Sequence, residues 1–388
     1  MRLCIVSPFP PEISGIGQYG WNVAHGLART GRFEAVTVLT GSRDHADLNQ
    51  VAQVDGLTTR CVWARDDVPS VGRLTAAIRR EQPDLVWFNL GFTAFGSSRV
   101  TNFAGLAAPM LTRQTGLPTV VTLHEIFEAS PPRALGAVNG RLTTWGARAA
   151  THLMLQANAV CVTLQRYQQE LQRRYSARNV WHVPHGAFAS PEFLPLPAAP
   201  MLTPPTLLIF ATFAPYKGLP ILLEAFERLK QVDPTVELII AGSDHPRFPG
   251  YLAEMRASVN GTRGLHWLGQ QTEAQLREVF ARASLVVLPY TATTGASSVL
   301  HRAAAYGRPV VASDLPDIRA VADEEGLQMV YVPPANPSAL AEALTRLLAN
   351  PAERLRLAQH NLQKMETMSL DHTCARYVEV FERVVGFK

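Results

Sequence analysis

The 388-residue sequence predicts an α/β protein of two doubly wound domains joined by a proline-rich linker. Short apolar runs alternate with helical patterns on both sides of residues 191–205, where six of fifteen residues are proline. Proline excludes helix and central strand from that segment, so we expect a stiff connector there. Two such domains placed face to face imply a cleft, and doubly wound sheets bind ligands outside the carboxyl ends of their strands.

The expected elements follow from apolar runs and from helix start and stop signals. In the N-terminal domain, residues 1–190, we expect a helix at 19–30 and strands at 3–7, 35–40, 85–88, 119–123, 159–163 and 180–183. In the C-terminal domain, residues 206–368, we expect strands at 207–211, 236–241, 265–268, 285–288 and 309–312, with helices at 218–231, 251–259, 273–283 and 299–306. The last segment, 369–388, has apolar residues at helical spacing and predicts a final helix.

Composition restricts the class of protein. With 47% hydrophobic residues the chain can bury two cores, and it has no apolar run of the length that spans a membrane. The apolar stretch within the opening residues MRLCIVSPFPPE is too short for a signal peptide, and it indicates a first strand instead. The four cysteines are scattered without metal-ligand or redox spacing. We therefore expect a cytoplasmic protein with reduced thiols.

Charge differs between the two halves. Residues 1–190 carry a net charge of +6 and residues 191–388 a net charge of −2, which together give the +4 of the whole chain. Such a basic half attracts an anionic membrane surface or a phosphorylated acceptor, and an ordinary solvated arginine-rich surface is an equal alternative. The basic half therefore predicts peripheral contact with the inner membrane face. No basic stripe with interleaved aromatic residues indicates nucleic acid.

Two strand–loop–helix stretches predict a diphosphate site. One loop carries Lys217 and Gly218, and Lys217 is one of only four lysines in the chain. An ammonium suits a phosphate oxygen, and glycine lets the backbone approach closely. The other loop, 289–298, is rich in Gly, Ser and Thr and precedes a helix whose cap, Ser297 or Ser298, would leave free N–H groups for an anion. The alternatives are an exposed loop lysine and an ordinary strand–helix loop.

A dinucleotide fingerprint near the N-terminus is a weaker signal. Gly15, Gly17 and Gly20 match G-x-G-x-x-G between a strand and a helix. Seven residues separate the strand from the first glycine, however, and no acidic residue ends the second strand to bind a ribose. These departures argue against a nicotinamide cofactor, and the glycines indicate a close backbone approach in the cleft.

His182 and His185 have no third ligand nearby in sequence, so no metal site is expected.

Taken in order along the chain, several motifs resemble retaining GT-B glycosyltransferases of family 4. The N-terminal PFPPEISGIGQYGWNVAHGLARTG is similar to the family's glycine-rich opening, and VPHGAF at 183–188 resembles its turn at the domain junction. TLHE at 122–125 stands where the family has a histidine close to the transferred sugar. LGQQTEAQL at 268–276 resembles the loop that holds the nucleotide base. The resemblance implies the GT-B fold, with two Rossmann-like domains and a last helix that packs back on the first.

The resemblance also implies roles for individual residues. The catalytic residues would be Lys217, on the departing phosphate, and His124, on the sugar; Glu125 would lie on the acceptor side. The donor-binding residues would be Gly15, Gly17, Leu268, Gly269, Thr294, Gly295, Ala296, Ser297, Ser298, Val299 and Arg302. The function implied is metal-independent, cofactor-free transfer of a sugar from a nucleotide-sugar to a glycan, lipid-linked or small-molecule acceptor.

Two departures from the family leave an alternative open. The family's signature is a pair of glutamates eight positions apart, and the alignment places Thr294 and Arg302 there. A guanidinium has only donors and cannot accept from a ribose diol. The alternative is therefore a non-catalytic GT-B protein that binds a nucleotide or glycan, although retention of Lys217 and His124 favours the enzyme.

Overall fold

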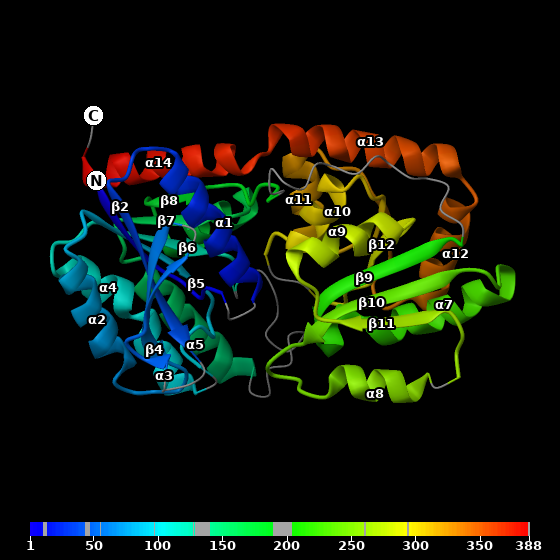
Figure 1. Cartoon of the computed structure of the whole chain (residues 1–388), viewed down its shortest axis with the longest axis horizontal. Helices are drawn as coiled ribbons and strands as arrows, with labels where there is room; N and C mark the ends of the chain where they lie inside the picture. The colour runs from blue at the N-terminus through cyan, green and yellow to red at the C-terminus, as the bar shows by residue number, and fades with distance from the viewer. Residues whose placement is uncertain are drawn as a thin grey trace. The chain divides into compact units, whose positions relative to one another are not determined.

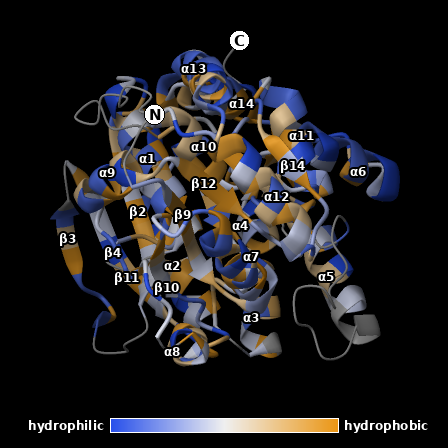
Figure 2. Cartoon of the chain, turned by 90° about the vertical axis from the view of Figure 1, so that its right-hand side faces the viewer, coloured by the Kyte–Doolittle hydropathy of each residue, from blue (hydrophilic) through white to orange (hydrophobic). Residues whose placement is uncertain are grey.

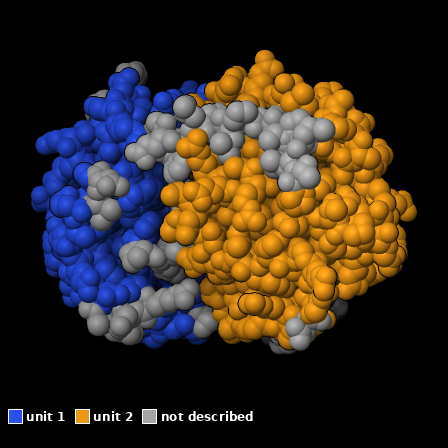
Figure 3. Space-filling view, turned by 45° about the vertical axis from the view of Figure 1, so that its right-hand side comes forward, with its two compact units in different colours: residues 1–133, 137–186, 370–388 blue, residues 134–136, 187–369 orange. Residues whose placement is uncertain are grey.

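A computed structural model describes residues 1–10, 14–42, 47–54, 56–96, 98–126, 128, 140–188, 204–259, 261–292 and 295–386. The chain divides into two compact units, shown in Figure 3. Unit 1 comprises residues 1–133, 137–186 and 370–388, and unit 2 comprises residues 134–136 and 187–369. Most of the expected linker, residues 191–203, lies outside the described residues.

Unit 1 is built on a sheet whose described strands run in the order β3-β4-β2-β1-β5-β6-β7-β8. The strands are β1 (Arg2–Val6), β2 (Ala35–Ser42), β3 (Val51–Val54), β4 (Leu57–Ala64), β5 (Leu85–Leu90), β6 (Thr119–Leu123), β7 (Ala159–Val162) and β8 (Val180–His182). All pair in parallel except β3, which pairs antiparallel with β4 at the sheet edge. Every residue of β5, β6 and β7 is buried, as expected of parallel strands covered on both faces.

The helices of unit 1 include the last one of the chain. They are α1 (Gly15–Arg29), α2 (Ser70–Glu81), α3 (Arg99–Leu106), α4 (Ala108–Gln114), α5 (Gly140–Met154), α6 (Gln165–Tyr175) and α14 (Leu370–Val385). Figure 1 shows α14, in red, beside α1, in blue. The two helices can approach closely because Gly26 has no side chain. A side chain at this position would overlap Cys374. The buried Tyr377 hydroxyl shares hydrogen bonds with the hydroxyls of Tyr19 (2.9 Å) and Thr122 (2.8 Å), and these bonds join α14 to α1 and β6.

Unit 2 is built on a parallel sheet with the order β11-β10-β9-β12-β13-β14. Its strands are β9 (Thr206–Phe213), β10 (Glu237–Asp244), β11 (Leu265–Gly269), β12 (Leu285–Leu288), β13 (Val310–Ser313) and β14 (Val330–Val332). Its helices are α7 (Leu219–Val232), α8 (Tyr251–Ser258), α9 (Glu273–Arg282), α10 (Ser298–Ala305), α11 (Pro316–Glu325), α12 (Pro337–Leu348) and α13 (Pro351–Thr367). A core of buried apolar residues from β9, β10, β12 and α7 holds this unit together, and Figure 2 shows the apolar colour of β9 and β12.

The prediction of doubly wound α/β sheets is confirmed, but the elements differ from those expected. Strand β14, helices α2 to α6 and helices α11 to α13 were not among the expected elements. The antiparallel pair β3–β4 adds a hairpin edge that the apolar pattern did not indicate. The helix expected from residue 19 begins at Gly15, because the Ser14 side chain caps it by accepting a hydrogen bond from the Gly17 amide at 2.9 Å. Most of the other expected strands and helices differ from the observed ones by one or a few residues at their ends. None of the helices among the described residues has the length and apolar character needed to cross a bilayer.

Candidate functional site

In unit 2 the two loops predicted to bind a diphosphate are joined at the carboxyl edge of the sheet. They follow β9 and β12, which are neighbouring strands. The Thr291 amide, after β12, donates to the carbonyl of Tyr216, after β9, at 2.9 Å. Gly218 has a left-handed backbone (φ +69°), and a side chain there would overlap the carbonyl oxygen of Pro289. Glycine therefore allows the two loops to meet.

Lys217 lies between two aromatic rings at this junction. It ends the 3₁₀ turn Pro215–Lys217, and its side chain is half-buried. The ammonium lies 4.1 Å from the ring centre of Tyr290 and 5.6 Å from that of Tyr216. Rings at these distances attract a cation and restrict its position. Tyr290 is almost completely buried, and that burial raises the pKa of its hydroxyl. The hydroxyl therefore stays protonated, and the side chain beside Lys217 is uncharged.

The glycine-rich loop leads into α10 as the sequence indicated. Gly295 is left-handed (φ +85°), Ala296 and Val299 are buried, and Ser298, the first residue of α10, is exposed. The first N–H groups of a helix have no intrahelical acceptor and form a site for an anion. Arg302 is half-buried on α10. Thr294 lies outside the described residues.

The expected cap residue is present in this loop, but the expected capping hydrogen bond is not. Ser297 is the cap residue of α10, but its hydroxyl makes no capping hydrogen bond. The loop is held instead by His301, whose Nδ1 lies 3.0 Å from the Ser297 carbonyl and whose Nε2 lies 2.9 Å from a carboxylate oxygen of Glu325. Burial disfavours a charged imidazole here, yet the charge and hydrogen bond of Glu325 raise the pKa of His301. The buried pair ties the Ser297 carbonyl to Glu325 of α11 and so fixes the loop at the start of α10.

The loop expected to hold a nucleotide base lies at the sheet edge. Leu268 and Gly269 end β11, which is separated from β9 by one strand. Neighbouring strands are about 4.8 Å apart, so β11 lies about 10 Å from β9. The side-chain amide of Gln271 donates to the Leu268 carbonyl at 2.7 Å and shapes the turn.

In unit 1 the glycine motif is part of a helix rather than a loop. Gly15 and Gly17 lie in the first turn of α1, which corrects the expectation of a glycine loop at these positions. A side chain at Gly20 would overlap the Ser7 hydroxyl and the Asn89 amide. The third glycine therefore allows α1 to pack closely on the ends of β1 and β5, which is a structural role.

His124 lies at the carboxyl edge of the unit 1 sheet. It follows β6 directly and is half-buried, with the edge of Tyr19 packed on it at 4.6 Å between ring centres. Its Nε2 lies 2.5 Å from Oδ1 of Asn89, near the end of β5. Burial lowers the pKa of His124 to about 3, so the imidazole is neutral at physiological pH. Half-buried Glu125 follows it in the chain.

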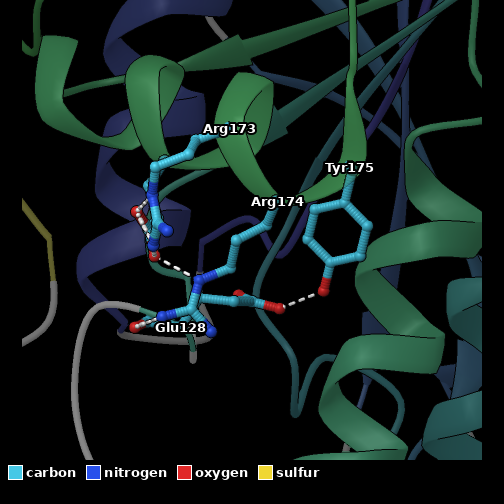
Figure 4. Close-up of polar contacts among 5 residues, drawn as sticks. Glu128, Arg173, Arg174 and Tyr175 are labelled. Atoms are coloured by element: carbon cyan, nitrogen blue, oxygen red, sulfur yellow. Dashed lines mark hydrogen bonds and ion pairs between the residues drawn. The ribbon is translucent and has the colours of Figure 1, made fainter.

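Part of the expected basic surface is neutralised by acidic neighbours. On α6, Arg173 bonds to the carboxylate of Glu170 at 2.9 Å, and Arg174 bonds to the same carboxylate (Figure 4). The Tyr175 hydroxyl donates to Glu128. These arginines therefore contribute less to an anion-attracting surface than their number suggests.

Four residues that shape these sites were not predicted from the sequence. Asn89 is the one polar residue in the buried strand LVWFNL, and a polar residue in such a run is a signal in itself. Tyr290, His301 and Glu325 gave no comparable signal, because their partners are far away in sequence. No group of three or more potential metal-ligating side chains is found among the residues that the structure describes.

Comparisons with known proteins agree with this architecture. Residues 13–187 match Glycosyltransferase Family 4, and residues 204–350 match Glycosyl transferases group 1. The chain belongs to glycosyltransferase family 4. A phosphatidyl-myo-inositol mannosyltransferase of Mycobacterium leprae is 29% identical over 171 residues, 44% of each chain. A D-inositol 3-phosphate glycosyltransferase of Salinispora arenicola is 32% identical over 182 residues, 44% of this chain and 40% of the relative. The chain thus matches less than half the length of these curated relatives.

Solved structures of glycosyltransferases share the fold over the whole chain. A sucrose-phosphate synthase from Thermosynechococcus elongatus has a TM-score of 0.78 at 16% identity, covering 100% of both chains. The Anabaena protein HepE, in complex with UDP and glucose, has a TM-score of 0.72 at 17% identity, covering 99% of this chain and 100% of that one. This family 4 chain therefore has the GT-B fold.

Proposed function

We propose that this family 4 chain is a hexosyltransferase. It moves a sugar from a nucleotide-sugar to a glycan, lipid-linked or small-molecule acceptor, with retention of configuration and without a metal or other cofactor. The observation that carries the proposal is the junction of the β9 and β12 loops, which places Lys217 in the loop joined to the one that leads into α10. A positive side chain and a helix N-terminus at one sheet edge suit a diphosphate leaving group.

The proposed chemistry depends on electrostatic stabilisation of the departing diphosphate. Lys217 and the first N–H groups of α10 bind the charge that develops as the bond to the sugar breaks. Because these protein groups supply positive potential, a metal is not required for that task. The departing phosphate takes the acceptor's proton on the same face of the sugar, which gives retention. The base lies near Leu268 and Gly269, one strand beyond β10.

The names of the relatives guide the choice of substrates. HepE was crystallised with UDP, and two curated relatives are named for transfer to phosphatidyl-myo-inositol and D-inositol 3-phosphate. Uridine diphosphate sugars and inositol phosphates are therefore the first donors and acceptors to test.

A non-catalytic binding protein is the second candidate. The observation in its favour is the replacement of both signature glutamates, by Thr294 and Arg302. Loss of the carboxylates removes acceptors for sugar and ribose hydroxyls but leaves the phosphate-binding groups in place.

We expect purified protein to be stabilised by one nucleoside diphosphate out of a panel. A ligand at about a hundred times its dissociation constant stabilises the folded state by about 2.7 kcal/mol, which a thermal-shift assay detects. The same nucleotide-sugar is then incubated with inositol phosphates and glycans, and transfer is measured by mass spectrometry. Binding without transfer or donor hydrolysis would support the second candidate, and absence of any shift would contradict a nucleotide site.

We also propose that unit 1 contacts an anionic membrane peripherally on the cytoplasmic side. Helices α3, α4 and α5 pack against one another and expose large apolar side chains: Val100 (72% exposed), Phe103 (42%), Leu111 (36%) and Trp145 (72%). Exposed Arg148 lies three residues after Trp145, and thus on the same side of α5. Apolar and aromatic side chains beside arginine suit the interface of an anionic bilayer.

The combined substitution Val100→Ser and Trp145→Ser should weaken binding to phosphatidylglycerol vesicles by at least about tenfold, because two apolar side chains no longer leave water. Co-sedimentation measures this effect. Val232→Ser is the matched control for the change at Val100. Val232 is also an exposed valine, 68% exposed, but it lies in unit 2. Equal binding by the double variant and the control, or equal binding to phosphatidylcholine, would refute the membrane contact.

A further inference from the structure

The hydrogen bonds around Asn89 assign the donor and acceptor roles at His124. Asn89 is fully buried near the end of β5, between β1 and β6 in the sheet. Its Nδ2 lies 2.8 Å from the Ser7 hydroxyl oxygen and 3.1 Å from the Ile16 carbonyl, and its Oδ1 lies 2.5 Å from Nε2 of His124. Three neighbouring strands and the first turn of α1 therefore meet at one side-chain amide.

The orientation of the Asn89 amide follows from what its partners can do. The Ile16 carbonyl has no proton and can only accept, so the amide nitrogen must face it. The Ser7 hydroxyl donates its proton to the Pro8 carbonyl at 2.7 Å, so the Ser7 oxygen accepts from Asn89. Both amide protons are then committed, and the amide oxygen faces His124.

The tautomer of His124 follows in turn. An amide oxygen can only accept, so Nε2 of His124 must carry a proton and donate it. In a neutral imidazole the other nitrogen, Nδ1, then carries a lone pair. The His124 ring is uncharged, because its burial against Tyr19 favours the neutral form of the imidazole.

We propose that Asn89 is a positioning residue that holds His124 as the Nε2–H tautomer, so that Nδ1 accepts a hydrogen bond from a hydroxyl of the donor sugar. This inference rests on the proposed transferase function and deepens it. His124 then accepts a hydrogen bond from the sugar, and it does not protonate the leaving group, because its one ring proton is donated to Asn89. The N-terminal glycine motif takes part through a backbone atom. The Ile16 carbonyl orients the Asn89 amide, and the Asn89 amide in turn orients the His124 ring.

The tautomer is measured on the free protein, independently of any activity. In protein labelled with 15N-histidine, the His124 signals are assigned by their loss in His124→Phe. We expect a neutral ring with the proton on Nε2 at pH 7. Ser7→Ala is the matched control: it removes one partner of Asn89 but keeps the Ile16 carbonyl, so the same tautomer should persist. A proton on Nδ1, or a charged ring, in the wild-type protein would overturn the proposal whether or not the chain transfers sugar.

Asn89→Asp tests the link to function. A carboxylate beside Nε2 should convert His124 to the charged imidazolium, visible in the same spectra, and Nδ1 would then donate instead of accept. We expect kcat/KM for the nucleotide-sugar to fall by about tenfold or more, while the affinity for the nucleoside diphosphate alone is unchanged. Conversion of the ring without any loss of kcat/KM would overturn the acceptor role, and loss of nucleoside diphosphate binding would show that the change acts through folding instead. Asn89→Leu, checked by circular dichroism, separates loss of the hydrogen bonds from added charge, and it should populate both tautomers.

Discussion

Lys217→Ala is expected to lower kcat by about 10²- to 10³-fold while weakening donor binding much less. The ammonium between Tyr216 and Tyr290 is placed for charge that develops on the departing diphosphate, and groups of this kind stabilise the transition state more than the ground state. Steady-state kinetics with the nucleotide-sugar found by thermal shift, together with direct titration of the nucleoside diphosphate, separates the two effects.

Lys230→Ala is the matched control for this variant. Lys230 lies on α7 in the same unit and bonds the carbonyls of Pro234 and Val236, away from the β9–β12 junction. It should leave kcat nearly unchanged. If Lys217→Ala weakens donor binding and leaves kcat intact, the transition-state role is wrong and Lys217 only anchors the donor. If both lysine variants lose the same activity, the effect is one of general charge or stability.

Gly218→Ala is expected to destabilise unit 2 by about 3 kcal/mol or more. A left-handed backbone costs a residue other than glycine about 1–2 kcal/mol, and the added methyl group would also overlap the Pro289 carbonyl. To relieve the overlap, the β9 and β12 loops must separate, so the Lys217 site should be lost as well. Urea unfolding monitored by circular dichroism gives the change in stability.

Gly250→Ala separates the two contributions. Gly250 is also left-handed (φ +84°), but a side chain there would meet no atom within 4 Å. That variant should lose only the conformational part, about 1–2 kcal/mol. Equal losses in the two variants would mean that the Pro289 contact costs nothing and that the loops are not locked together at Gly218.

The start of α1 shows why local glycine content misleads. Three glycines within six residues predict a loop, because glycine is a poor helix former. The structure has a helix there, since Ser14 caps it and the absence of a side chain at Gly20 lets it pack on Ser7 and Asn89. Tertiary packing outweighs a propensity of about 1 kcal/mol per residue.

Local sequence patterns were enough to predict the two doubly wound domains, the family, and the two loops that meet beside Lys217. These features depend on local patterns: buried parallel strands appear as apolar runs, and loops that follow such strands open at the same sheet edge. Lys217 and the loop before α10 could therefore be placed together without coordinates, because their strands β9 and β12 belong to one sheet.

Which side chains meet at these sheet edges depends on how the elements pack, and local patterns do not contain that information. Asn89 reaches His124 because β5 and β6 are neighbours, and its amide is oriented by Ser7 and Ile16 from two other elements. His301 meets Glu325 across the packing of α10 and α11, where no sequence period connects them. Apolar periodicity reports which face of an element is buried, but not which element covers it. Hydrogen-bond roles depend on that second fact, and so the chemistry of His124 could be derived only once strand order was known.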